Sequence, residues 1–182
     1  LFESWTDRYE PKNEADKVKN PNAVADGYLR DGRGFDLIRV RGWYTQEYFH
    51  KSEIGEGSTT VRFPMPNGYW ERVLDKPQRF GKQKARIVGS NKGLVWQAPM
   101  FTDKDLAECE EIYITEGIFD AISWIHAGKA AVSNISSSNY PDKFLAKILK
   151  NCPQGKRPTI VWAQDGDRAG TKAILKFAKL AE

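Results

Sequence analysis

The stretch IYITEGIFDAI (residues 112–122) places a carboxylate and a glycine directly after an apolar run that is typical of a buried strand. A second stretch, VWAQDGDRAG (residues 161–170), repeats this arrangement with two carboxylates. A buried strand gains no stability from a bare carboxylate at its end, because removing a charge from water costs free energy. We therefore expect Glu116, Asp165 and Asp167 to hold a charged group.

Strands and helices alternate regularly from Glu110 to the end of the chain. The predicted strands are EIYIT, KAAVSN and TIVWAQ, and the predicted helices are GIFDAISWIHAG, PDKFLAKILK and RAGTKAILKFAKLAE. Such alternation, with strands that are apolar throughout, favours an α/β domain in which helices flank a parallel sheet.

The preceding part of the chain has a less regular pattern. NAVADGYLRDGRGFDL predicts a short helix that ends in a glycine, and STTVRFPMPNGYWERVLD predicts a hairpin with PNG at its turn. ARIVGSNKGLVW predicts a strand, a loop and another strand. We assign residues 1–105 to a smaller, basic, mixed α+β lobe and residues 106–182 to the α/β domain.

Composition excludes several classes of protein. The chain has 182 residues with only two cysteines and two histidines, which are scattered, so neither a zinc site nor a disulfide framework is expected. No apolar run is long enough to span a membrane and no signal peptide opens the chain, which together favour a cytoplasmic protein. The chain begins at Leu1 and ends within a helical pattern, so we expect a fragment of a longer protein.

The distribution of charge is more informative than the net charge of +4. Basic side chains gather between residues 62 and 92, and acidic ones dominate residues 103–120. The basic residues are Arg62, Arg72, Lys76, Arg79, Lys82, Lys84, Arg86 and Lys92. A basic stretch followed by an acidic site suggests a polyanionic partner and a metal-dependent site in one protein.

The carboxylates fall where an open α/β sheet binds its ligands, at the carboxyl ends of the strands. Glu116 ends one predicted strand, Asp165 and Asp167 follow another, and Asp120 lies in the first turn of the intervening helix. Carboxylates crowded at one edge repel each other unless a cation lies between them. Mg²⁺ prefers such oxygen ligands, so the pattern predicts a magnesium site.

Each motif also has an ordinary structural interpretation. Glu-Gly after a strand is common, Asp-Gly-Asp can be a simple turn, and Asp120 can be a carboxylate favoured by the helix dipole. Taken singly, each motif favours that interpretation. Taken together, at successive strand ends of one sheet, they favour a functional site.

The two stretches IYITEGIFDAI and VWAQDGDRAGTKA together resemble the TOPRIM domain, which bacterial-type primases share with topoisomerases and some nucleases. The form DGDRAG is typical of bacterial-type primases, including those of phages, plasmids and other mobile elements. YLRDGRGFDL, VRFPMPNGYWERVLD and KARIVGSNKGLVW resemble the segments that precede TOPRIM in those primases. The resemblance covers roughly residues 22–182.

The resemblance implies a DNA primase core that makes RNA primers from NTPs on a single-stranded DNA template. It implies that Glu116 is a metal ligand or general base, that Asp165 and Asp167 are the metal-binding pair, and that Asp120 supports them. The cofactor would be Mg²⁺ or Mn²⁺, and a replicative helicase is a further expected partner. The family's N-terminal zinc module and its third acidic motif are not matched in this chain.

The same resemblance implies that Lys84 and Arg86 contact the template or nucleotide. The clustering of positive charge adds Arg62, Arg79, Lys82 and Lys92 to the expected contacts. Two alternatives stay open: a TOPRIM-type metal-dependent nuclease, and a non-catalytic module that binds single-stranded nucleic acid. A topoisomerase is disfavoured, because no tyrosine lies in an evident cleavage domain.

Overall fold

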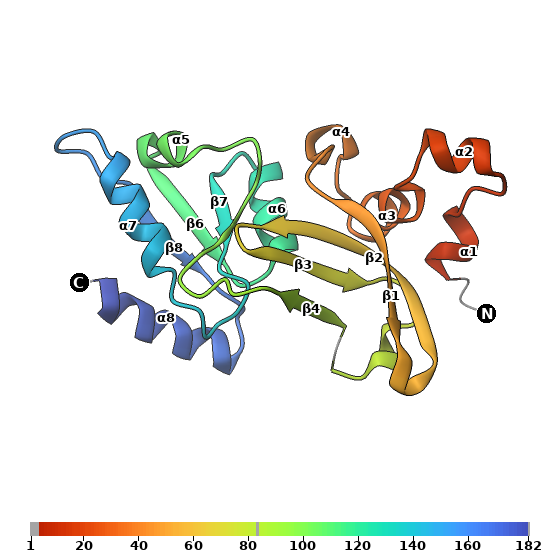
Figure 1. Ribbon diagram of the computed structural model, residues 1–182. Coiled ribbons are helices and arrows are strands. Elements are labelled where there is room, and N and C mark those ends of the chain that lie inside the picture. The colour runs from red at the N-terminus through yellow and green to blue at the C-terminus, as the bar shows by residue number, and fades with distance from the viewer. Residues whose placement is uncertain (1–3, 83, 182) are drawn as a thin grey trace. The chain divides into compact units, whose positions relative to one another are not determined.

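The computed structural model describes residues 4–82 and 84–181 and divides into two compact units. The N-terminal unit comprises residues 1–89 and the C-terminal unit residues 90–182 (Figure 1). This division falls before the predicted boundary at residue 105, because the segment from Ser90 onward contributes a strand and a helix to the second sheet and its core. Within the described residues, no helix is long and apolar enough to cross a membrane.

The N-terminal unit consists of short helices and one antiparallel sheet with the strand order β1-β2-β3-β4. The strands are β1 (Thr45–Lys51), β2 (Glu56–Met65), β3 (Gly68–Val73) and β4 (Ala85–Val88). The α-helices are α1 (Trp5–Tyr9), α2 (Glu14–Lys19), α3 (Ala23–Gly27) and α4 (Leu37–Val40). A π-helical turn, η1 (Tyr28–Gly32), continues α3, and the 3₁₀ turns η2 (Ser52–Ile54) and η3 (Pro77–Phe80) follow β1 and β3. This lobe is therefore more regular than its sequence pattern suggested.

The predicted hairpin is confirmed in β2 and β3. Met65 pairs with Gly68, so that the turn consists of the two residues between them. Gly68 has a φ of 104°, a conformation that residues with a Cβ atom rarely adopt, which explains the glycine of the PNG motif.

Helix α3 covers one face of this sheet and is fixed to it by side chains. Gln46 of β1 accepts hydrogen bonds from the backbone N–H groups of Val24 (2.8 Å) and Ala25 (3.0 Å) at the start of α3. Val61 and Phe63 of β2 are fully buried, as are Val24 and Ala25. The core of this unit therefore lies between α3 and the sheet.

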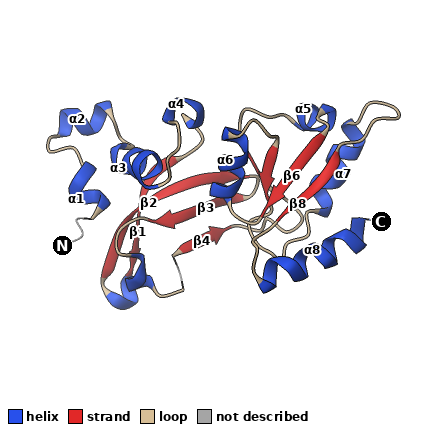
Figure 2. Cartoon of the chain, turned by 180° about the vertical axis from the view of Figure 1, so that it is seen from behind, coloured by secondary structure: helices blue, strands red, loops and turns tan. Residues whose placement is uncertain are grey.

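The C-terminal unit is a sheet with the strand order β5-β7-β6-β8 and four helices. Its strands are β5 (Trp96–Gln97), β6 (Glu111–Thr115), β7 (Ala131–Ser133) and β8 (Thr159–Ala163). Its helices are α5 (Asp103–Glu108), α6 (Ile118–His126), α7 (Asp142–Asn151) and α8 (Arg168–Ala181) (Figure 2). The three strands predicted from sequence pair in parallel, but β5 runs antiparallel to β7, so the sheet is mixed rather than purely parallel.

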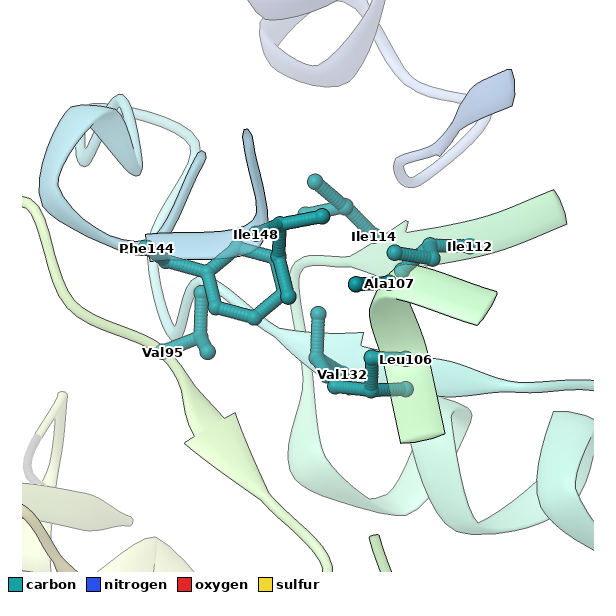
Figure 3. Close-up of a cluster of buried hydrophobic side chains, with 8 residues drawn as sticks. All are labelled: Val95, Leu106, Ala107, Ile112, Ile114, Val132, Phe144 and Ile148. Carbon is teal, nitrogen blue, oxygen red and sulfur yellow. The ribbon is translucent and has the colours of Figure 1, made fainter. Parts of the chain in front are cut away.

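Helices pack on both faces of the second sheet. On one face, Ile112 and Ile114 of β6 join Val132 of β7 in a buried cluster with side chains of α5 and α7 (Figure 3). The complete cluster is Val95, Leu106, Ala107, Ile112, Ile114, Val132, Phe144 and Ile148. On the other face, Tyr113 meets Trp124 of α6 with ring centroids 4.6 Å apart. The core therefore holds the carboxyl ends of β6, β7 and β8 in fixed register.

Candidate functional site

Glu116 follows the central strand of the second sheet. β6 lies between β7 and β8 and runs parallel to both, so the carboxyl ends of all three strands meet at one edge. Thr115 pairs with Ser133 of β7 and with Ala163 of β8. The segment that carries Asp165 therefore leaves the sheet beside Glu116, as the sequence predicted for an open α/β site.

The pKa of Glu116 depends on its burial, on Ser137 and on the other two predicted catalytic carboxylates. Partial burial raises the pKa of Glu116 above its ordinary value, and the negative charges of Asp165 and Asp167 raise it further. Hydrogen bonds from Ser137 to the Glu116 carboxylate lower its pKa and oppose these effects. The three carboxylates thus share one electrostatic field, and a bound cation would relieve their repulsion.

Asp167 also has a structural role. Its Oδ1 atom accepts a hydrogen bond from the backbone N–H of Gly170 (2.8 Å), and its carbonyl oxygen accepts one from Thr171 N (3.0 Å). Asp167 therefore caps the start of α8, a role that the sequence analysis did not assign to it. Asp165 is exposed, and within the described part of the chain its side chain forms no hydrogen bond or ion pair.

Gly170 is a residue of the site that the sequence analysis missed. It is buried in the first turn of α8, and a Cβ atom there would overlap the backbone carbonyl oxygen of Asp165. The absence of a side chain lets α8 begin directly against the turn that carries Asp165 and Asp167. The final glycine of the DGDRAG motif could have indicated this role, because a glycine inside a predicted helix often has a packing reason.

Asp120 lies close to the backbone that follows Glu116. A methyl group at Gly117 would overlap the Asp120 carboxylate, so this side chain folds back over Gly117 from the first turn of α6. Gly166, by contrast, has no atom within 4 Å of the place where its Cβ would lie. The lack of a side chain at Gly117 therefore leaves room for the Asp120 carboxylate. At Gly166, by contrast, no neighbouring protein atom would meet an added Cβ atom.

The serine-rich loop after β7 contacts Glu116, a role that the sequence analysis did not predict for this loop. Ser137 hydrogen-bonds the Glu116 carboxylate, and Ser133 Oγ donates to the Glu116 carbonyl oxygen (2.8 Å). Asn139 Nδ2 donates to the carbonyl oxygen of Asn134 (2.9 Å), and Asn134 Nδ2 donates to that of Asn139 (3.1 Å). Ile135 has a φ of 70°, which is rare for a β-branched residue. The loop is thus braced in an unusual conformation beside Glu116.

The predicted metal ligands at this edge of the sheet are carboxylates. The carboxylates are hard oxygen ligands, and Mg²⁺ is commonly held by one or two carboxylates together with water and substrate phosphates. Two buried acceptors just beyond the ends of β7 and β8, Asn134 Oδ1 and Gln164 Oε1, have no hydrogen-bond partner among the described residues. Among the described residues, no group of three or more histidine, cysteine or acidic side chains is arranged so that it could hold a metal ion.

Two of the predicted nucleic-acid contacts lie around a buried carboxylate in the N-terminal unit. Arg62, Glu71 and Arg86 occupy paired positions on β2, β3 and β4. The Glu71 side chain is 0% exposed, and it forms ion pairs with both arginines, at 3.1 Å to Arg62 Nη2. Arg62 lies over the ring of Tyr69 (3.8 Å to the centroid) and Arg86 over that of Phe49 (4.2 Å). Both guanidinium groups are thus held in place while remaining partly exposed.

The other four predicted contacts are exposed side chains that differ in their ion pairing. Arg79 forms an ion pair with Glu56. Lys82, Lys84 and Lys92 are exposed, and none of them forms an ion pair with another described residue. Lys92 belongs to the C-terminal unit and the other five basic residues to the N-terminal unit.

Comparison with known proteins bears on the C-terminal unit. Residues 113–182 match the family model described as Toprim-like, so the chain contains a Toprim-like domain. Such domains occur in primases, topoisomerases and nucleases and bind Mg²⁺, which is consistent with a metal-dependent enzyme acting on nucleic acids. The search of curated proteins found no significant match. The search of solved structures found none either.

Proposed function

We propose that this chain, with its Toprim-like domain, is the catalytic core of a DNA primase that makes short RNA primers on single-stranded DNA. The observation that carries the proposal is the placement of Glu116 and of the segment with Asp165 and Asp167 at the carboxyl ends of two neighbouring parallel strands. Nucleotidyl transfer needs such a carboxylate site to place a divalent cation against a triphosphate.

In the proposed reaction, the 3′-hydroxyl of a ribonucleotide attacks the α-phosphorus of an incoming NTP. A bond forms between the 3′ oxygen and that phosphorus, the bond from the α-phosphorus to its bridging oxygen breaks, and pyrophosphate leaves with the electron pair. Glu116, which follows the strand beside that segment, would accept the hydroxyl proton. Asp165 and Asp167 would hold Mg²⁺ or Mn²⁺, which when bound neutralises phosphate charge and activates the hydroxyl.

A primase is favoured over a nuclease by the N-terminal unit. The stretches that resemble primase sequence form its helix end, its hairpin and its last strand, and the hairpin carries the Arg62 and Glu71 pair. Arginines that are partly exposed and lie over aromatic rings are common partners of nucleic acids. The partners in this proposal are single-stranded DNA, NTPs and a replicative helicase.

A primer-synthesis assay tests the proposal. The chain is incubated with single-stranded DNA, labelled NTPs and Mg²⁺ or Mn²⁺, in parallel with Asp165→Ala. Glu110→Gln is the matched control, because Glu110 is an exposed carboxylate of the same unit. We expect short RNA products from the unmodified chain and from Glu110→Gln, and none from Asp165→Ala.

Two other results would replace the proposal. Cleaved template without RNA, again abolished by Asp165→Ala, identifies a nuclease that uses the same carboxylates. Retained single-strand binding, with neither RNA nor cleavage under any metal condition, identifies a binding module.

A further inference from the structure

A pocket of about 390 Å³ lies within the N-terminal unit, between α1 and the segment that follows β3. Trp5 and Tyr28 contribute aromatic rings to its lining, and Arg72 and Lys76 contribute cations. The carboxylate site belongs to the C-terminal unit, so this pocket is a separate site. Its volume lies within the range of pockets that bind small ligands.

The aromatic rings at the pocket contact one another. Trp5 meets Tyr28 edge-on, with ring centroids 5.3 Å apart and an interplanar angle of 88°, and it stacks on Tyr9 at 6.0 Å. Tyr28 is buried, and Trp5 is half-buried. An indole ring held in this way offers a platform on which a nucleobase can stack, whatever the base.

The cations of the pocket have no anionic partner among the described residues. Neither Arg72 nor Lys76 forms an ion pair there, whereas Arg62, Arg79 and Arg86 of the same unit all do. Both basic side chains are therefore available to bind phosphate.

The one carboxylate that lines the pocket, Asp75, is already engaged. It is buried, its Oδ1 accepts from the backbone N–H of Thr6 (3.2 Å), and its Oδ2 accepts from the Thr6 hydroxyl. These bonds fix α1 against the end of β3, so Asp75 maintains the shape of the pocket.

Lys76 is held in an unusual backbone conformation. Its φ of 42° and ψ of 56° are left-handed, and it precedes a proline, which disfavours helical conformations of the residue before it. Such conformations concentrate at functional sites, where the surrounding structure maintains them. Here the conformation sets Lys76 at the start of the turn η3, where it lines the pocket.

We propose that this pocket binds one nucleotide, with the base against Trp5 and the phosphate on Arg72 and Lys76. The nucleotide is either a free ribonucleoside triphosphate or one unit of a single strand, since both present the same base and phosphate. The inference does not depend on the chemistry of the carboxylate site, because the pocket is built from other residues.

The test measures binding directly in the full 182-residue chain, with Asp165→Asn as the background and EDTA present. These conditions remove the contribution of the metal site. The binding result is therefore independent of whether the chain makes primers. ATP is titrated by calorimetry, and a fluorescein-labelled oligothymidylate is titrated by anisotropy. The test variants are Trp5→Leu and Lys76→Gln, with Trp5→Phe as the conservative variant and Lys12→Gln as the exposed control, and circular dichroism checks that each one folds.

We expect Trp5→Leu and Lys76→Gln each to weaken binding about tenfold, while the affinities of Trp5→Phe and Lys12→Gln stay close to that of the Asp165→Asn background. A loss confined to ATP identifies a free nucleotide as the ligand, and a loss confined to the oligothymidylate identifies a unit of a strand. Equal affinity of Lys76→Gln and the Asp165→Asn background for both probes overturns the proposal, as does the absence of any binding by that background.

Discussion

The charged carboxylate of Glu116 destabilises the folded protein, although the proposed chemistry requires it. Burial and the charges of Asp165 and Asp167 raise its pKa in the folded protein above the value in the unfolded chain. The folded state therefore binds this proton more tightly, and the stability that results is present at low pH. That stability is lost as the pH rises through the raised pKa, because the charged form is repelled.

Replacement of Glu116 by glutamine should separate these two demands. We expect Glu116→Gln to abolish primer synthesis and yet to raise the melting temperature at neutral pH in EDTA, because it removes the repelled charge. At a pH below the ordinary pKa of glutamate the melting temperatures should converge. Thermal melts across pH, with Glu110→Gln as control, measure this difference, and a lower melting temperature of Glu116→Gln at neutral pH would contradict the assignment.

Glu71 offers the opposite case, a buried charge that the fold compensates. Its side chain is 0% exposed and lies between Arg62 and Arg86, whose side chains are 26% and 36% exposed. Removing the shared anion leaves two cations facing each other across the sheet. We expect Glu71→Gln to lower the free energy of unfolding by roughly 2–4 kcal/mol, as measured by urea denaturation.

The matched control for Glu71 is Glu56, which pairs with Arg79 at the surface. Glu56→Gln should change the free energy of unfolding by less than about 1 kcal/mol, because exposed ion pairs contribute little. Equal losses in the two variants would show that burial of Glu71 does not set its importance.

At the scale of the element, one face of helix α7 is buried in the core and the opposite face is exposed. Ile148 is 2% exposed within the buried cluster, whereas its neighbour Leu149 is 53% exposed. We expect Ile148→Ala to lower the free energy of unfolding by roughly 2–4 kcal/mol, because it leaves a cavity. Leu149→Ala should cost less than about 1 kcal/mol in the same denaturation experiment, and comparable losses would contradict this orientation of the helix.

Most elements could be predicted because their patterns are local. The apolar runs at β6, β7 and β8 and the helical spacing in α6, α7 and α8 each identify their element without reference to the rest of the chain. Helix α5 was missed because it is short, although Thr102 and Asp105 form a capping box that is visible in the sequence as Thr-x-x-Asp. The pattern ARIVGSNKGLVW predicted a strand where β5 begins, but not its antiparallel pairing with β7, because only two residues pair and their partner lies far along the chain.

The acidic residues of the candidate site could be proposed from the sequence, but the residues that contact them could not. Asp165 and Asp167 are recognisable because they directly follow an apolar run. The contribution of Ser137 depends on β7 lying next to β6, which is a property of strand order rather than of local sequence. The burial of Glu71 between two arginines likewise depends on register between three strands. The sequence pattern had treated those arginines as part of a continuous basic stretch.

For the whole molecule, the charge map predicts binding to nucleic acid that depends on salt. Lys82 and Lys84 are exposed and without ion pairs among the described residues, so both are available to phosphate. We expect the double variant Lys82→Gln, Lys84→Gln to reduce the slope of log affinity for single-stranded DNA against log salt by about 1–2. Anisotropy titrations over a range of salt concentrations measure that slope.

The matched control for this pair is the double variant Lys147→Gln, Lys150→Gln, which removes the same charge from exposed positions on α7. We expect its slope to equal that of the unmodified chain. If both double variants reduce the slope equally, net charge governs the interaction, and no particular surface does.

Gly170 has a consequence for how this protein can evolve. Every coding change at this position introduces a Cβ atom, and that atom would meet the backbone carbonyl of Asp165. In a mutational scan that scores both cellular abundance and primer synthesis, we expect all substitutions at Gly170 to be depleted on both scores. Gly166, with open space around it, should accept alanine without loss of abundance. A lineage could thus change the acids of this motif for new chemistry sooner than it could change the one residue that contributes no side chain.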